Sequence, residues 1–247
     1  MDGVLIIDKP IGITSHDVVS RVRRILGERS VGHTGTLDPF ASGVLVILVG
    51  RATRLAQFLS GSDKAYEAVI RLGFATDTGD RTGTPLSEDE AAASALVWSD
   101  QEIEAAMKNL RGEIQQVPPM YSAKKQGGRK LYELARRGEQ VERQPVRVII
   151  RAFAAAGGAT HNSAGTTDLP VRVECSAGTY IRTLAEDFGK HLGIGAHLAE
   201  LRRTRVGNWT ILQALTLEEL EERAQGKTLT DVVLSPDEAL GDLPFVS

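Results

Sequence analysis

Hydrophobic and polar positions along this chain follow two periods, which predicts strands alternating with helices. The apolar run at residues 44–49 is continuous and is typical of a strand buried on both faces. Residues 64–72 alternate instead, so that one face of the predicted strand is apolar and includes Tyr66. Further strands are predicted over residues 4–7, 146–154, 169–175 and 206–212.

Capping residues mark the starts of several predicted helices. A Ser or Thr followed three residues later by an acid is the pattern of a capping box, and it occurs at Thr14, Ser99 and Thr216. Another helix is predicted over residues 180–192, with Arg182 in about its first turn. A guanidinium there meets the positive end of the helix dipole, which is slightly unfavourable unless an anion compensates it. Short helices are also predicted over residues 51–59 and 131–137.

Helices and strands alternate irregularly along the chain. This order favours an α+β fold, with a mixed, largely antiparallel central sheet flanked by helices, over a doubly wound parallel sheet. No internal repeat or apolar linker divides the chain, so we expect a single domain over residues 1–247. Residues 118–145 begin and end with proline and are rich in basic side chains, and we predict that they form an inserted lobe.

Composition narrows the class of protein. With 247 residues, of which 42% are hydrophobic, the chain can build a packed core and is neither a disordered tract nor a coiled coil. Cys175 is its only cysteine, so no intrachain disulfide can form, and its strand spacing predicts a core position. We find no basic leader and no apolar run approaching the roughly 20 residues of a membrane span. We therefore expect a cytoplasmic protein.

The net charge of −3 hides a strong local imbalance. Between residues 121 and 151 there are nine basic and three acidic side chains. Charge runs are commonly just solvated surface, yet a polyanion responds to the local field of such a patch and not to the sum over the molecule. Binding of an anionic partner therefore explains this basic segment at least as well as a solvated surface does.

The octapeptide Gly-His-Thr-Gly-Thr-Leu-Asp-Pro at residues 32–39 is the strongest candidate for chemistry. Two glycines and a proline bracket one imidazole, His33, and one carboxylate, Asp38. A carboxylate presented on a bent backbone is a candidate nucleophile, base or metal ligand. An Asp-Pro turn beside a hydrogen-bonded histidine is the simpler alternative.

Residue spacing argues against a metal or nucleotide cofactor. The five histidines include no helix-spaced pair and there is no cysteine cluster, so no metal site is predicted. The glycine-rich segment lacks the Gly-Lys-Ser/Thr ending of a P-loop, and no Gly-x-Gly-x-x-Gly follows a strand. We therefore predict neither a metal nor a cofactor.

Five sequence blocks occur in one order along the chain. They are Asp-Lys-Pro-x-Gly-x-Thr-Ser-His-Asp at residues 8–17, the octapeptide at 32–39, Ser-Asp-Lys-x-Tyr at 62–66, Pro-Pro-x-Tyr-Ser-Ala at 118–123 and Gly-Thr-Tyr-Ile-Arg at 178–182. Together these blocks resemble the bacterial tRNA pseudouridine-55 synthases, and the likeness extends from residue 3 to about residue 235. Members of that family commonly continue into a small C-terminal RNA-binding domain of the PUA type, which we expect this chain to lack.

The resemblance implies an isomerase with an RNA substrate. In this family one uridine of the tRNA T loop is cut from C1′ at N1, turned, and rejoined through C5. No electrons or external groups are exchanged, so no cofactor is implied. The expected partner is the T stem-loop of tRNA, and neither a membrane nor an obligate protein partner is implied.

Three residues match catalytic positions of the family. Asp38 matches the aspartate that attacks the substrate, at either C6 of the ring or C1′ of the sugar, and an Asp with a pKa of about 3.9 is already ionised at neutral pH. Arg182 matches the arginine paired with that carboxylate, and a purely structural link between helix and loop is the alternative. Tyr66 matches a tyrosine that lies against the target ring and is a candidate for moving its proton, whereas an aromatic in that position is otherwise typical of a core.

Other matches concern binding. His33 matches a histidine that holds the loop open once the uridine has left the stack, and a capping histidine bonded within its own turn is an equal alternative. Tyr180 and Leu201 match residues that line the uracil pocket, and both also suit plain packing. The predicted RNA contacts are Lys64 of the third block and, within the lobe, Arg129, Lys130 and Arg136.

Two other classes of function are alternatives to an RNA-isomerising enzyme. A non-catalytic tRNA-binding or folding-helper protein would use the same residues without chemistry, but binding alone does not need Asp38, Tyr66 and Arg182 together. A hydrolase with Asp38 as its base would need a partner acid or metal at a recognisable spacing, and the chain has none. We therefore favour the isomerase.

Overall fold

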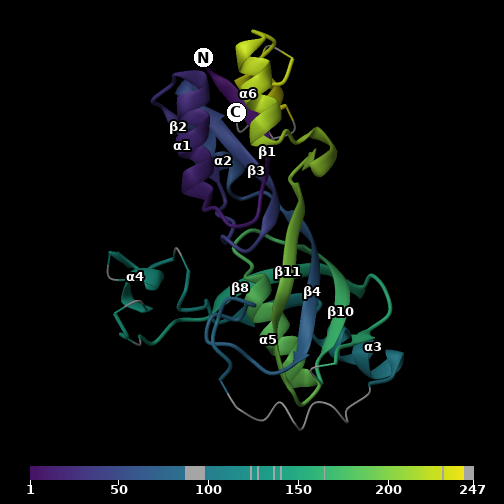
Figure 1. Ribbon diagram of the computed structural model, residues 1–247. Helices are drawn as coiled ribbons and strands as arrows, with labels where there is room; N and C mark the ends of the chain where they lie inside the picture. Colours follow the sequence, from purple (N-terminus) through teal and green to yellow (C-terminus); the bar gives the residue numbers. More distant parts are fainter. Residues whose placement is uncertain are drawn as a thin grey trace. The chain divides into compact units, whose positions relative to one another are not determined.

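The fold is seen in a computed structural model of the chain (Figure 1). It describes residues 1–86, 98–122, 124–126, 128–135, 137–139, 141–163, 165–229 and 231–241. The chain divides into two compact units: unit 1 comprises Met1–Lys64 and Arg202–Ser247, and unit 2 comprises Ala65–Leu201. The organisation of residues 1–247 as one catalytic domain stays a prediction.

Unit 1 contains a small sheet with helices packed on it. Its elements are β1 (Gly3–Lys9), α1 (Ser15–Leu26), β2 (Val31–Thr34), β3 (Ser42–Val49), the 3-10 helix η1 (Gly50–Leu55), α2 (Ala56–Leu59), the C-terminal part of β11 (Gly195–Val206), β12 (Trp209–Thr210), the 3-10 helix η3 (Ile211–Gln213), α6 (Leu217–Gln225) and α7 (Pro236–Leu240). The strands predicted over residues 4–7 and 44–49 are confirmed as β1 and β3.

Strand β3 is the centre of the unit 1 sheet. It pairs antiparallel with β1 along its whole length, from Gly3 opposite Val49 to Lys9 opposite Gly43. On its other edge β3 pairs antiparallel with β2 and, at its first residues, parallel with β11. The short segment between β2 and β3 therefore has both of its ends fixed in the sheet.

Both faces of β3 are buried, as its continuous apolar run predicts. The odd-numbered residues 45–49 pack with α1 and α6, and the even-numbered residues 44–48 pack with η1 and α2 on the opposite face (Figure 1). Successive side chains of a strand point to opposite faces, so a strand covered on both sides needs apolar residues at every position.

Unit 2 contains a larger sheet with helices beside it (Figure 1). Its elements are β4 (Lys64–Gly73), α3 (Asp100–Asn109), β5 (Gly112–Gln116), β6 (Lys125–Gln126), β7 (Arg129–Lys130), α4 (Leu131–Ala135), β8 (Val146–Ala155), β9 (Thr160–His161), β10 (Thr167–Cys175), α5 (Ile181–His191) and the N-terminal part of β11. The strand order is β11-β4-β10-β8-β5, and β8 is antiparallel to both of its neighbours. Phe188 of α5 packs edge-on against Phe153 of β8, with ring centroids 5.5 Å apart.

These features confirm the predicted α+β class with a mixed, largely antiparallel sheet. The three predicted capping boxes are also confirmed, since Thr14, Ser99 and Thr216 each accept a bond from the residue three positions later and that residue's carboxylate bonds back. The helix predicted over 51–59 is instead 3-10 helix η1 followed by the single turn of α2.

The strand predicted over residues 206–212 is wrong. Strand β11 ends at Val206, and after a turn the chain forms β12 and then η3. The prediction missed most of β11 because Arg202 and Arg203 interrupt its apolar pattern. The structure accepts both cations in a strand because each bonds a group that is distant in the sequence: Arg202 pairs with Asp8, and Arg203 donates to main-chain carbonyls. Strands β2 and β5 were not predicted either.

The segment predicted as an inserted lobe, residues 118–145, runs between β5 and β8. Its described part contains the β6–β7 hairpin and α4 (Figure 1). Arg129 is exposed on β7, and Lys130 ends the same strand. Arg136 lies outside the described residues, and so does the end of the helix predicted over 131–137.

Cys175 and His197, both in unit 2, have buried side chains. Cys175 is fully buried at the end of β10, which confirms the predicted core position. Separately, no helix among the described residues is long and apolar enough to cross a membrane. His197 of β11 is also buried, with 2% of its surface exposed.

His197 is a neutral histidine within unit 2. Its Nδ1 lies 2.9 Å from the carbonyl oxygen of Phe74, so this nitrogen carries the proton and donates it, and the two rings lie 4.6 Å apart. Burial lowers the pKa of His197, and the bond to Phe74 offsets only part of this effect. The folded state therefore resists protonation of this ring.

Replacing His197 by Asn should flatten the acid limb of the stability profile. In the wild-type protein the unfolded state takes up a proton near pH 6.5 and the folded state only at lower pH, so the free energy of unfolding falls as pH drops through 6.5. Asn keeps a donor near the position of Nδ1 but does not titrate. Uptake of one proton by the unfolded state contributes at most about 1.4 kcal/mol per pH unit below 6.5, so between pH 7.5 and 5.5 we expect the free energy of unfolding to fall less in the variant than in wild type, by up to about 1.4 kcal/mol. Urea unfolding at both pH values measures it, and equal pH slopes in the two proteins would contradict it.

Candidate active site

Asp38 lies on the loop between β2 and β3, residues 35–41, here called the Asp38 loop. Gly35 leaves β2 with φ +77°, a conformation that favours glycine. The amide of Ala41 donates to the Asp38 carbonyl at 3.1 Å, which closes a turn with proline in its second position. Leu37 and Phe40 are buried on either side, and Asp38 itself is half-buried.

The Asp38 loop is fastened to the segment before and at the start of α1. The Ser15 hydroxyl accepts a hydrogen bond from Leu37 N at 2.9 Å and donates one to Leu37 O at 3.1 Å. The amide of Gly12 donates to Pro39 O at 2.7 Å. Residues on both sides of Asp38 are therefore held by hydrogen bonds to their main-chain atoms, and these bonds join the first and second sequence blocks in space.

Two buried cations lie behind this loop. Arg203 is 1% exposed, and its Nη2 donates to Gly35 O at 3.0 Å while its Nε donates to Val44 O at 2.7 Å. The Lys9 side chain is fully buried, and its Nζ donates to the carbonyls of Pro10 and Ile13, both at 2.8 Å. Arg203 thus links β11 to the start of the Asp38 loop.

The electrostatics of these groups favour a charged Asp38. Burial lowers the pKa of Lys9 to about 8, with Asp38 acting in the opposite direction and Arg203 adding to the lowering. Lys9 is therefore still mainly protonated at pH 7. A nearby cation favours the ionised form of a carboxylate, which is the form a nucleophile needs.

His33 lies on β2, opposite Ile47 of β3. Burial lowers its pKa, and the charges of His16 and Arg203 lower it further, so the ring is neutral at pH 7. Its Nδ1 is buried and has no hydrogen-bond partner among the described residues. This geometry does not match a capping histidine bonded through that nitrogen within its own turn.

Arg182 lies in the first turn of α5, in unit 2, and is 5% exposed. Its Nη1 donates to Thr78 O at 2.8 Å and its Nη2 to Tyr121 O at 2.7 Å, and its Nε lies 3.9 Å from Asp80 Oδ2. The nearby carboxylate supplies the anion that a guanidinium at this end of a helix requires. Arg182 thus joins α5 to two other segments of unit 2.

Asp80 is held in a tight polar turn. Its Oδ1 accepts bonds from Thr82 N at 2.9 Å, from Thr82 Oγ1 at 2.5 Å and from Thr78 Oγ1 at 3.0 Å. Gly79 before it has φ +72°, and an added Cβ would collide with the Glu186 carboxylate. Asp80 Oδ2 is therefore presented to Arg182 by a backbone that allows little adjustment.

The remaining predicted residues lie in two groups. In unit 2, Tyr66 on β4 and Leu201 on β11 are each 7% exposed and occupy neighbouring strands, and Tyr180 directly precedes α5. In unit 1, Lys64 is also 7% exposed, and its Nζ donates to the carbonyls of Ser60 and Ser62. Unit 1 thus holds His33, Asp38 and Lys64, and unit 2 holds Tyr66, Tyr180, Arg182 and Leu201. A pairing of Asp38 with Arg182 stays a prediction.

Comparison with known families gives this geometry its context. Residues 23–181 match the TruB family pseudouridylate synthase (N terminal domain), and residues 182–241 match the tRNA pseudouridylate synthase B C-terminal domain. The chain belongs to the TruB family of pseudouridylate synthases. Members of this family isomerise uridine to pseudouridine in tRNA.

TruB family relatives resemble the chain over its full length. The tRNA pseudouridine synthase B of Symbiobacterium thermophilum is 51% identical over 247 residues, which is all of this chain and 78% of that protein. The Geobacter sulfurreducens protein of the same name is 46% identical over 98% of this chain and 77% of its own length. The crystal structure of a Cbf5-Nop10-Gar1 complex contains a chain of similar fold, with a TM-score of 0.73 and 30% sequence identity. The match covers 96% of the chain described here and 61% of the chain in that complex.

Sequence reasoning missed four side chains that hold predicted site residues or the loop that carries them: Lys9, Ser15 and Arg203 in unit 1, and Asp80 in unit 2. The first two lie inside the block at residues 8–17, which was singled out only as a motif. Asp80 ends the run Thr-Asp-Thr-Gly-Asp at residues 76–80, whose composition signals a turn. Arg203 carries no local signal, because its acceptors are far away in the sequence.

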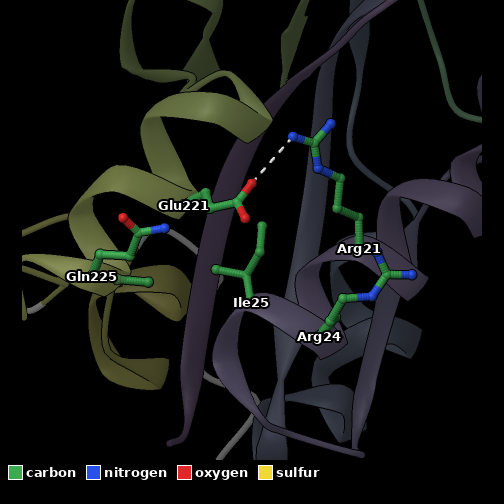
Figure 2. A pocket seen from close by; sticks show the side chains of 6 residues that line it. Arg21, Arg24, Ile25, Glu221 and Gln225 are labelled. Atoms are coloured by element: carbon green, nitrogen blue, oxygen red, sulfur yellow. Dashed lines mark hydrogen bonds and ion pairs between the residues drawn. The ribbon is translucent and has the colours of Figure 1, made fainter.

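A pocket of about 290 Å³ lies elsewhere in unit 1, between α1 and α6 (Figure 2). Arg21 at its edge forms ion pairs with Glu218 at 3.0 Å and Glu221 at 3.3 Å. Its lining residues are Arg21, Arg24, Ile25, Glu221, Ala224 and Gln225. None of these belongs to the Asp38 loop or to any of the five blocks, so this pocket is not the active site.

Asp80→Asn should lower the rate of pseudouridine formation at least about tenfold, which corresponds to about 1.4 kcal/mol of barrier. The amide keeps the Oδ1 acceptor but removes the negative charge facing Arg182 Nε. Steady-state kinetics on tRNA measures it. Asp77→Asn is a matched control in the same loop, because Asp77 is exposed and bonds Thr84 N through a single oxygen, and it should stay within about twofold of wild type. A wild-type rate in Asp80→Asn would show that the charge is not needed.

Proposed function

We propose that this chain converts the uridine at position 55 in the tRNA T loop to pseudouridine. The observation that carries the proposal is the Asp38 loop, a bend bonded through its main chain that presents one half-buried carboxylate near the buried Lys9, with the buried Arg203 bonded to the start of the loop. This loop and the end of β2 before it carry the octapeptide by which the chain resembles the pseudouridine-55 synthases. Relatives named tRNA pseudouridine synthase B support tRNA as the substrate.

The proposed reaction is balanced within the nucleotide. The N1–C1′ bond breaks and a C5–C1′ bond forms, the proton on C5 is lost, and N1 gains a proton. The Asp38 carboxylate attacks either C6 of the ring or C1′ of the sugar and is released unchanged at the end. No oxidant, reductant or external group enters, so the proposal invokes no cofactor.

The other predicted residues take supporting roles. We assign Arg182 to orient and charge-stabilise Asp38, and Tyr66 to lie against the target ring and move its proton. The uridine must leave the stacked loop before reaction, at a cost of about a few kcal/mol. His33, Tyr180 and Leu201 are proposed to hold the extruded base. A neutral His33 suits this role, because it adds no charge beside an uncharged ring.

Binding to the tRNA backbone is assigned to the lobe, where basic residues outnumber acidic ones, and to the region around Lys64. Recognition of a folded RNA loop depends on shape, phosphates and splayed bases more than on groove readout. A cytoplasmic location is part of the proposal, since the substrate is tRNA.

Asp38→Asn should abolish pseudouridine formation and leave tRNA affinity within about threefold of wild type. The amide has the same size but is a far weaker nucleophile. Unmodified tRNA transcript is incubated with each protein, and pseudouridine is mapped at base resolution. Asp100→Asn, an exposed carboxylate in the first turn of α3, is the control and should keep full activity.

The same experiment separates the proposal from its alternative. A non-catalytic tRNA-binding protein would give no pseudouridine even as wild type, and Asp38→Asn would then change nothing. Modification at a position other than 55 would contradict the assigned target.

Replacing Arg129, Lys130 and Arg136 together by Gln should weaken tRNA binding and flatten its dependence on salt. Each phosphate contact contributes about 0.7 to 0.9 to the slope of log K against log salt, so we expect the slope to fall by about 2. Binding is measured by titration between low and physiological ionic strength. The control replaces Arg24, Arg29 and Lys108, which are exposed and outside the lobe, by Gln. Equal slopes in the two triple variants would remove the lobe from the binding surface.

A further inference from the structure

The start of helix α5 has an unusual cap. Tyr180 is the N-cap residue, and its side chain makes no capping hydrogen bond. Its backbone is extended, with φ −100° and ψ 108°. In such a conformation the N–H and C=O of one residue point to the same side, as they do in the hydrogen-bonded pair of an antiparallel sheet. Both groups can therefore be satisfied by a single amide.

Gln116 supplies that amide from the end of β5. Its Oε1 accepts the Tyr180 N–H at 2.9 Å, and its Nε2 donates to the Tyr180 carbonyl at 3.1 Å. The Gln116 side chain is fully buried. Its carbonyl and one of its two amide N–H groups both form hydrogen bonds with the main chain of Tyr180. The side chain thus imitates a neighbouring strand for Tyr180, although Tyr180 lies in no strand.

A second link joins the same two parts of the chain. Arg182, two residues after Tyr180, donates through Nη2 to the carbonyl of Tyr121, five residues after Gln116. The turn before α5 is also bonded at its beginning, where Ser176 N donates to Ile149 O at 2.8 Å and Ser176 Oγ accepts from Ile149 N at 2.9 Å. The Gln116 pair holds the turn at its end, directly before α5.

We propose that Gln116 is a positioning residue for the isomerisation: it sets the backbone of Tyr180 and thereby the direction from which α5 presents Arg182. It touches no substrate and acts through these two residues. The inference rests on the proposed function, because Tyr180 and Arg182 carry their roles only in that reaction.

The chemistry of the amide explains why glutamine is needed. Glutamate can accept from Tyr180 N, but when ionised it has no donor for the Tyr180 carbonyl. Methionine fills a similar volume and offers neither group. The chain also supplies a matched control, because the neighbouring Gln115 lies on the same strand but is exposed.

The test compares Gln116→Met and Gln116→Glu with Gln115→Met and Gln115→Glu. For Gln116→Met we expect kcat on tRNA to fall at least about tenfold, while KM stays within about threefold because the proposed phosphate contacts lie in the lobe. Both Gln115 variants should stay within about twofold of wild type. A folded Gln116→Met protein with the kcat of Gln115→Met would overturn the inference.

Gln116→Glu gives a readout that simple loss of packing would not move. A buried carboxyl next to a carbonyl is protonated more readily than one in water, and the protonated acid has both a donor and an acceptor. The ratio of kcat between Gln116→Glu and Gln115→Glu should therefore rise at least about fivefold from pH 8 to pH 5.5. A ratio that stays near one at every pH would contradict the inference even if Gln116→Met fails to fold.

Hydrogen exchange separates this inference from the proposed function. In Gln116→Glu at pH 8 the amides of residues 180–183 should exchange at least about tenfold faster than in Gln115→Glu. Wild-type protein that makes no pseudouridine would overturn the proposed function, whereas unchanged exchange would overturn the positioning by Gln116 alone.

Discussion

The guanidinium of Arg203 is buried, and its hydrogen bonds to main-chain carbonyls connect several segments of unit 1. Leaving such a charge buried without acceptors would cost on the order of several kcal/mol. Its acceptors are carbonyls of Val44 on β3 and Gly35 at the start of the Asp38 loop, so strand, loop and β11 assemble together. The backbones of β3 and β11 also approach each other closely here, because a Cβ on Gly43 would lie 2.7 Å from the main-chain nitrogen of Arg203.

The same device recurs in unit 2. There too, a buried polar side chain from one segment bonds the main chain of another: Gln116 holds the start of α5, and Arg182 holds the carbonyls of two loops. Bonds to the main chain fix a whole segment, whereas bonds between side-chain tips fix only those tips. A reaction that rearranges one nucleotide without an external reagent depends on placement of this kind.

Local patterns predicted local structure well. The capping box at Thr14 and the apolar run of β3 were both confirmed, because a cap involves neighbours in the chain and a doubly covered strand needs apolar residues at every position. Strand β11 was missed because the partners that make its arginines acceptable, Asp8 and Val44, lie 194 and 159 residues away along the chain. No periodicity in one segment can report acceptors in another.

The sequence by itself determined the reaction class and the candidate nucleophile Asp38 through the order of its motifs, and the α+β class through the irregular alternation of predicted helices and strands. Tertiary structure alone decided which side chains hold these groups: Ser15 on the Asp38 loop, Asp80 beside Arg182, and Gln116 before α5. The physical reason is that a reactive side chain can be recognised from its residue type and its neighbours in the sequence. Its orientation, in contrast, depends on hydrogen bonds that form only when distant segments meet.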